Sequence, residues 1–186
     1  YAKNITLQLL PEIKNWTKYV DCDLRIAIVG FGKMGLLHSG ILNLLKPGIV
    51  KAIVDKSFLL ILGSSRIIKS VKFYRSIEKM IKEMEPSAVY VTTPTNSHYP
   101  ILKTLLKHGI RYIFVEKPPT INYEQLKDLI RMKKSDQYIM VGFQKRYAIS
   151  FRYAKMLLDN MVIDEIESVY AYIKSGDILS PTSRFD

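Results

Sequence analysis

One glycine motif restricts the fold of this chain more than any other feature of its sequence. Three glycines at G-x-G-x-x-G spacing follow an apolar run over 24–29 and precede an apolar stretch with helical periodicity. The motif is Gly30-Phe31-Gly32-Lys33-Met34-Gly35. We therefore predict a buried parallel strand, a tight turn and a helix over 33–45. The predicted apolar face of this helix consists of Met34, Leu37, Ile41 and Leu44/Leu45.

Each glycine of the motif has a physical role in such a strand–turn–helix unit. Gly30 permits the tight turn, Gly32 lets a pyrophosphate approach the backbone, and Gly35 lets the helix pack closely against the strand. The free N–H groups and the positive dipole end of the helix would then hold the phosphates of a dinucleotide. The alternative interpretation is a structural turn without a ligand.

An acidic residue at the end of the second apolar run supports a dinucleotide site. Residues 49–54 are predicted to form the second strand, and Asp55 follows directly. A carboxylate there can accept hydrogen bonds from the adenosine ribose hydroxyls and would repel the 2′-phosphate of NADP. NAD is therefore the expected cofactor, with NADP as the alternative, because the neighbouring Lys56 could soften this repulsion. The competing interpretation of Asp55 is a surface aspartate.

Short apolar runs alternate with helical patterns through most of the remaining chain. Further strands are predicted over 71–74, 88–91, 112–115 and 138–141, and helices over 76–84, 97–107 and 122–134. The predicted cap residues are Ser76, Asn96 or Ser97, the Asn122/Gln125 capping box and the C-terminal Gly109. Residues 57–68 are ambiguous between a short helix and a loop. The alternation predicts an α/β fold, a doubly wound parallel sheet with helices on both faces.

The pattern divides the chain into three parts. Residues 23–147 are predicted to form a dinucleotide-binding domain. Residues 1–22 form an N-terminal extension, in which Leu10, Ile13, Trp16 and Val20 predict an amphipathic helix over about 11–20 that packs on the domain or on a partner subunit. Residues 148–186 are predicted to begin a second, α+β domain that this chain does not complete, with a helix over 148–160 and a strand over 166–173.

Composition excludes several classes of protein. With 48% hydrophobic and 24% charged residues, the chain is typical of a globular protein. No apolar run approaches the roughly 20 residues that span a bilayer, and no signal-peptide pattern is present. Cys22 is the only cysteine, so an intrachain disulfide is excluded and a cytoplasmic location is the default expectation.

The net charge of +11 raises the question of a nucleic-acid partner. The basic residues are spread from Lys3 to Arg184 without a dense block, which favours a solvated lysine-rich surface. A basic nucleic-acid-binding domain is therefore a weaker alternative, and no membrane partner is expected. Cys22 and His108 lack companions at metal-ligand spacing, so no metal is predicted. His38, on the first predicted helix, is interpreted as a packing residue.

Polar motifs follow three of the predicted strands. They are Thr93-Pro94-Thr95-Asn96-Ser97-His98, Glu116-Lys117-Pro118 and Gly142-Phe143-Gln144-Lys145-Arg146. Doubly wound sheets bind ligands at the carboxyl ends of their strands, where these residues would meet. His98 could alternatively serve as a capping or packing residue, and Lys117 could be a surface lysine.

Together with the glycine motif, these segments resemble the Gfo/Idh/MocA family of oxidoreductases over about 23–186. The resemblance implies a Rossmann-type domain that binds NAD or NADP and a reaction on a sugar, polyol or related hydroxyl or carbonyl compound. It implies that Lys117 is catalytic, assisted by Glu116, and that Arg146 lies near the substrate. The implied cofactor-binding residues are Gly30, Phe31, Gly32, Lys33, Met34, Gly35, Asp55, Thr93, Pro94, Asn96, His98, Glu116, Lys117 and Arg146.

The resemblance has further implications. It implies a cis peptide bond between Lys117 and Pro118, and we expect the full-length protein to form a homo-oligomer. Enzymes of the family continue into a substrate domain that usually carries a D-x-x-x-H pair, and no such pair follows Arg146 in this sequence. The alternative function is that of a dinucleotide-sensing regulatory or binding protein that kept the fold without catalysis.

Overall fold

The computed structural model describes most of the predicted dinucleotide-binding domain. The described residues are 24–57, Ile61, 70–160, Ser168, Tyr170 and Tyr172. The helix predicted over 11–20 lies outside them, as do most of the ambiguous segment 57–68 and most of the strand predicted over 166–173.

Six parallel strands form one sheet in the order β3-β2-β1-β4-β5-β6. The strands are β1 (Ile26–Val29), β2 (Val50–Val54), β3 (Lys72–Tyr74), β4 (Ala88–Val91), β5 (Tyr112–Val115) and β6 (Tyr138–Val141). This order is that of two mononucleotide-binding halves, with the reversal between β1 and β4. The predicted Rossmann-type sheet is therefore confirmed, and the last three strands have the predicted bounds.

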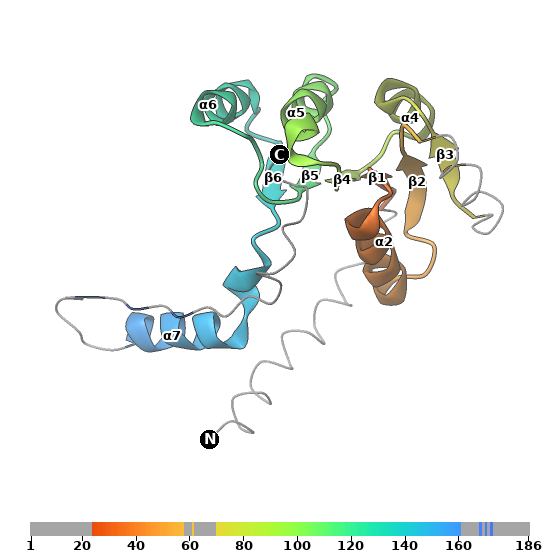
Figure 1. Ribbon diagram of the computed structural model, residues 1–186. Coiled ribbons are helices and arrows are strands. Elements are labelled where there is room, and N and C mark those ends of the chain that lie inside the picture. The colour runs from red at the N-terminus through yellow and green to blue at the C-terminus, as the bar shows by residue number, and fades with distance from the viewer. Residues whose placement is uncertain are drawn as a thin grey trace, which may run out of the picture. The chain divides into compact units, whose positions relative to one another are not determined.

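Helices cover both faces of the sheet, with α2 on one face and α4, α5 and α6 on the other (Figure 1). The helices are α2 (Lys33–Leu45), α4 (Ile77–Met84), α5 (His98–Lys107), α6 (Tyr123–Met132) and α7 (Ile149–Asn160). Two short 3₁₀ segments, η2 (Thr95–Ser97) and η3 (Gln144–Tyr147), precede α5 and α7. The β-strands alternate their side chains between two apolar clusters, one beneath α4, α5 and α6 and one beneath α2.

Two of the predicted helix caps are formed by side chains. Ser76 Oγ accepts a hydrogen bond from the Lys79 N–H at 3.2 Å, and Asn122 Oδ1 accepts one from the Gln125 N–H at 2.9 Å. The side-chain cap predicted for α5 is wrong, because the Ser97 hydroxyl donates to the carbonyl of Pro94 instead. The turn η2 precedes α5 and redirects this hydroxyl.

The apolar face predicted for α2 is on the wrong side of the helix. Gly35 and Ser39 are buried against the sheet, whereas Leu37 is 51% exposed and Leu44 is 86% exposed. The reason is the close approach of the helix to the glycine turn. A Cβ atom on Gly35 would lie 2.1 Å from the carbonyl oxygen of Gly30, so only small residues fit on that side.

The chain divides into two compact units, residues 1–142 and 143–186. The sheet and the helices α2, α4, α5 and α6 belong to the first unit. The second unit contains η3, α7 and the residues predicted to open a second domain.

Candidate active site

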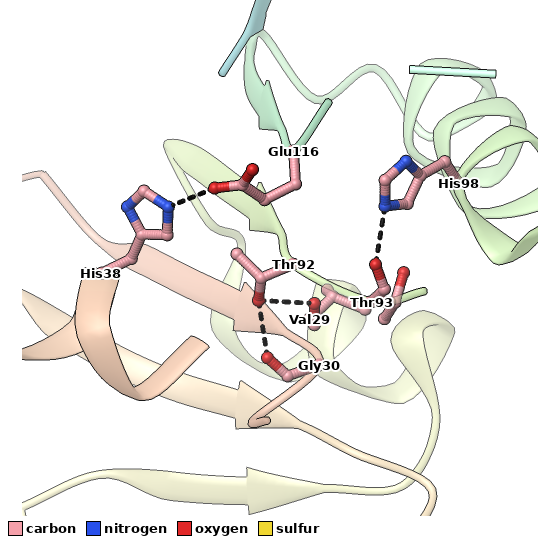
Figure 2. A network of polar contacts seen from close by, with 7 residues as sticks. All are labelled: Val29, Gly30, His38, Thr92, Thr93, His98 and Glu116. Atoms are coloured by element: carbon pink, nitrogen blue, oxygen red, sulfur yellow. Dashed lines mark hydrogen bonds and ion pairs between the residues drawn. The ribbon is translucent and has the colours of Figure 1, made fainter. Parts of the chain in front are cut away.

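The turn between β1 and α2 is locked in place by the neighbouring strand ends. Gly30 has a φ of +92°, its N–H donates to the Val54 carbonyl at 2.8 Å, and its own carbonyl accepts a 2.6 Å hydrogen bond from Thr92 Oγ1 (Figure 2). A side chain at Gly30 would collide with Thr93. The tight turn predicted from the glycine spacing is therefore held by hydrogen bonds from the ends of both strands that flank β1, namely β2 and β4.

Gly32 lies in a different environment from the other two glycines of the motif. A Cβ atom placed on Gly32 meets nothing within 4 Å, so the protein itself does not require glycine there. Gly32 is the N-cap of α2, no side chain caps that helix, and its first turn carries no acidic residue. Open space beside uncapped N–H groups at a helix N-terminus fits an approaching pyrophosphate.

Asp55 lies beside this turn, at the end of β2. Its Oδ2 accepts a 2.7 Å hydrogen bond from the Phe31 N–H, and its Oδ1 accepts a 2.8 Å bond from the Ser57 N–H. Each carboxylate oxygen retains a lone pair, so Asp55 can still accept bonds from ribose hydroxyls. The side chain of Phe31 is buried against Phe73, and its N–H is bonded to Asp55, so Phe31 shapes the loop rather than offering a free donor.

His98 joins two loops. Its side chain is 1% exposed, with Nε2 2.7 Å from the Thr93 carbonyl oxygen (Figure 2) and Nδ1 2.8 Å from the Pro118 carbonyl oxygen. Carbonyl oxygens only accept, so both contacts are hydrogen bonds when both ring nitrogens carry protons. His98 therefore ties the loop after β4 to the loop after β5.

Thr93, Pro94 and Asn96 lie in the loop that His98 anchors. Pro94 and Asn96 are exposed, whereas the Thr93 hydroxyl is buried. Within the described part of the chain, that hydroxyl has no hydrogen-bond partner. The Thr93 hydroxyl, next to Gly30, therefore keeps hydrogen-bonding capacity that the described residues do not use at this edge of the sheet.

Glu116 contacts the helix that begins at the glycine motif. Its Oε1 lies 2.8 Å from Nε2 of His38 on α2, and both side chains are largely buried (Figure 2). The His38 ring also packs in a tilted arrangement against the rings of Phe114 and Tyr90, at centroid distances of 4.9 Å and 5.8 Å. Burial raises the pKa of the Tyr90 hydroxyl above its ordinary value. His38 thus connects the glycine helix to the Glu116-Lys117-Pro118 segment.

Sequence reasoning missed the link between His38 and Glu116. The two residues are 78 positions apart, and His38 was interpreted as a packing residue. One signal was available: His38 follows Gly35 by one helical turn, and Glu116 follows β5 directly. The start of α2 and the segment after β5 both lie at the carboxyl edge of the sheet, so the side chains of His38 and Glu116 can come into contact there.

Lys117 is exposed at the same edge of the sheet. Among the residues that the structure describes, none forms a hydrogen bond or ion pair with its ammonium group. The peptide bond between Lys117 and Pro118 is cis, as predicted.

The remaining predicted site residues lie in two places. Lys33 and Met34 open α2 beside Gly32. Arg146 lies in the second unit, so its predicted place near a substrate stays a prediction.

Replacing His98 with alanine is expected to lower the free energy of unfolding by about 2 kcal/mol or more, since two carbonyl groups lose their partner and a cavity forms. Urea denaturation followed by circular dichroism measures this change. His108→Ala is the matched control, because His108 is exposed and its Nδ1 contacts the Thr104 carbonyl within its own helix end. Equal stability of both variants would show that His98 does not hold the two loops together.

Two further kinds of feature are absent from the described part of the chain. No group of three or more histidine, cysteine, aspartate or glutamate side chains in that part of the chain could hold a metal ion. No helix among those residues has both the length and the apolar character needed to cross a membrane.

Comparison with known proteins places this arrangement in a family. A family model described as an oxidoreductase family with an NAD-binding Rossmann fold matches residues 24–143. The chain is 26% identical over 141 residues to myo-inositol 2-dehydrogenase of Thermotoga maritima, covering 75% of this chain and 42% of that protein. It is 27% identical over 145 residues to scyllo-inositol 2-dehydrogenase (NAD(+)) of Bacillus subtilis, covering 75% and 41%.

Solved structures agree with the fold. A probable dehydrogenase from Thermotoga maritima matches with a TM-score of 0.67 at 26% identity, and myo-inositol 2-dehydrogenase from Lactobacillus plantarum with a TM-score of 0.65 at 26% identity. Each match covers 74% of this chain and 41% of the solved chain, so the sequence spans less than half the length of these relatives. With the glycine motif, Glu116-Lys117-Pro118 and the matched span 24–143 in place, the chain belongs to the Gfo/Idh/MocA family of oxidoreductases.

Proposed function

We propose that this chain is the cofactor-binding part of an NAD-dependent oxidoreductase that acts on the CH–OH group of a sugar or polyol. One observation carries the proposal: the His38–Glu116 contact of 2.8 Å joins the glycine helix directly to the segment that bears Lys117. A phosphate-binding turn and a lysine that the described residues leave unpaired therefore belong to one sheet edge. The named relatives that oxidise inositols support the choice of a polyol.

The open space at Gly32 is the proposed place of the cofactor pyrophosphate, with the first N–H groups of α2 as donors. Asp55 is the proposed acceptor for the adenosine ribose hydroxyls. When bound, NAD would accept or return a hydride at its nicotinamide ring. The chain's own residues would hold the cofactor and orient it toward the exposed Lys117.

Lys117 is the proposed catalytic residue. A positive charge close to the reacting oxygen polarises a carbonyl, or lowers the pKa of a hydroxyl so that it loses its proton more readily. The described residues leave the ammonium without an ion-pair partner, so its charge is available to a substrate. Glu116 precedes it on the chain, and we assign Glu116 a positioning role, held in place by His38.

Gly32→Ala is expected to weaken NADH binding by more than about tenfold, a loss of about 1.4 kcal/mol, while leaving the fold intact. The new methyl group enters only open space, and the φ of −74° suits alanine, so the cost to folding is small. Fluorescence titration with NADH measures the affinity, and thermal unfolding measures the fold. Gly40→Ala is the control, because it adds a methyl group to the same helix away from the turn. Unchanged NADH affinity of Gly32→Ala would contradict the proposed cofactor site.

NADH is expected to bind about tenfold or more tightly than NADPH. The carboxylate of Asp55 is fixed by two backbone N–H groups, so it cannot turn away from a 2′-phosphate without giving up these bonds. Dissociation constants of the two reduced cofactors, measured on the unmodified chain, give the ratio directly. Tighter binding of NADPH would mean that Lys56 or another cation accepts the phosphate and that the role assigned to Asp55 is wrong.

A further inference from the structure

The outward side of α2 carries a continuous set of exposed apolar side chains. We call it the leucine face, and its members are Leu36, Leu37, Ile41, Leu44 and Leu45. They are between 45% and 86% exposed. The opposite side of the helix is already packed on the sheet, and Lys33 is the only charged residue in α2. A continuous exposed apolar face of this kind marks a place where another segment or molecule packs.

The end of α2 lies where the N-terminal segment enters the domain. Leu24 and Leu42 pack on the same apolar cluster. The Ile26 N–H donates to the Ile49 carbonyl at 3.2 Å, which places the start of β1 beside the connection that leaves α2. The last turn of the leucine face, with Leu44 and Leu45, is therefore close to the residue at which the preceding segment joins.

The preceding segment has the pattern that such a face requires. Leu10, Ile13, Trp16 and Val20 recur at intervals of three, three and four residues, which predicts an apolar helical stripe. A helix over 11–20 would be about 15 Å long, and α2 with its 13 residues is about 20 Å long. Only a few residues separate Val20 from Leu24, so the tether keeps the stripe at high effective concentration near α2.

We propose that the N-terminal segment of this chain covers the leucine face of α2, with Leu10, Ile13, Trp16 and Val20 packed against it. The matched family span begins at residue 24, so this cover lies outside the segment shared with the family. Its effect is to shield the outer side of the helix whose N-terminus forms the glycine turn. A second copy of the chain is the competing occupant, which the experiment below distinguishes.

Trp16 is the only tryptophan of the chain, so its fluorescence reports on this contact alone. In the 186-residue chain we expect a blue-shifted emission and weak quenching by acrylamide, compared with the chain in denaturant. Leu44→Lys should shift the emission to the red and increase quenching. Ile130→Lys is the matched control, because Ile130 is an equally apolar, 61% exposed residue on α6. It should leave the emission unchanged.

A second variant, in the N-terminal segment instead of α2, separates loss of the contact from a failure of the domain to fold. Ile13→Lys alters only the N-terminal segment and should produce the same red shift, while circular dichroism and NADH binding stay unchanged. Native-state quenching as strong as in denaturant would overturn the proposal. A blue shift that disappears on dilution, together with dissociation of a dimer in size-exclusion chromatography, would overturn it in favour of a second copy.

Discussion

Lys117→Ala, introduced into the full-length protein, is expected to lower turnover of a polyol or sugar by about 10²–10⁴-fold, the usual contribution of a positioned acid–base group. The affinity for NADH should stay within a small factor. The reason is that the proposed phosphate-binding turn, at Gly30 and Gly32, lies between β1 and α2, whereas Lys117 follows β5. Steady-state kinetics and NADH titration on the same preparation measure both quantities.

Lys107→Ala is the control for this experiment. Lys107 is an exposed lysine at the end of α5, so its removal changes the net charge equally without touching the proposed site. Equal turnover by the Lys117→Ala variant and the unmodified protein would exclude Lys117 as the catalytic residue. If no polyol or sugar is turned over by the unmodified protein although NADH binds tightly, the dinucleotide-sensing alternative would be favoured.

Gly35→Ala is expected to remove more than about 3 kcal/mol of the roughly 5–15 kcal/mol that stabilise a typical domain. The added Cβ atom would lie 2.1 Å from the Gly30 carbonyl oxygen, and the obstacle is backbone that Thr92 holds at 2.6 Å. The helix must therefore move away from the turn, which also disrupts the N-terminal end of α2. Urea denaturation measures the loss of stability.

Gly40→Ala tests whether this loss is specific to position 35. Gly40 lies in the same helix, and a Cβ atom there meets nothing within 4 Å. Because alanine is the better helix former by about 1 kcal/mol, this control should be neutral or slightly stabilising. A similar loss of stability in both variants would mean that the loss is not specific to position 35, so the close approach to Gly30 would not explain it.

The sequence alone determined the elements and their order. Each strand is a short apolar run, and each boundary depends on neighbouring residues, such as Ser76 at the start of α4 or Asn122 at the start of α6. The spacing of the three glycines predicted the turn, because a positive φ and a close approach of helix to strand are requirements set by neighbouring residues of the motif itself. The positions of Asp55 and Lys117 at strand ends followed from the same alternation.

Tertiary structure decided which side chains meet and which sides are buried. Periodicity showed that α2 is a helix, but a helix with apolar residues on both sides gives no sign of which side faces the sheet; the contact of Gly35 with Gly30 settles that. The contacts of His38 with Glu116, and of His98 with the Pro118 carbonyl, form at the carboxyl edge of the sheet between segments that are distant in the sequence. Such contacts depend on the strand order in space, which brings together residues that no local pattern connects.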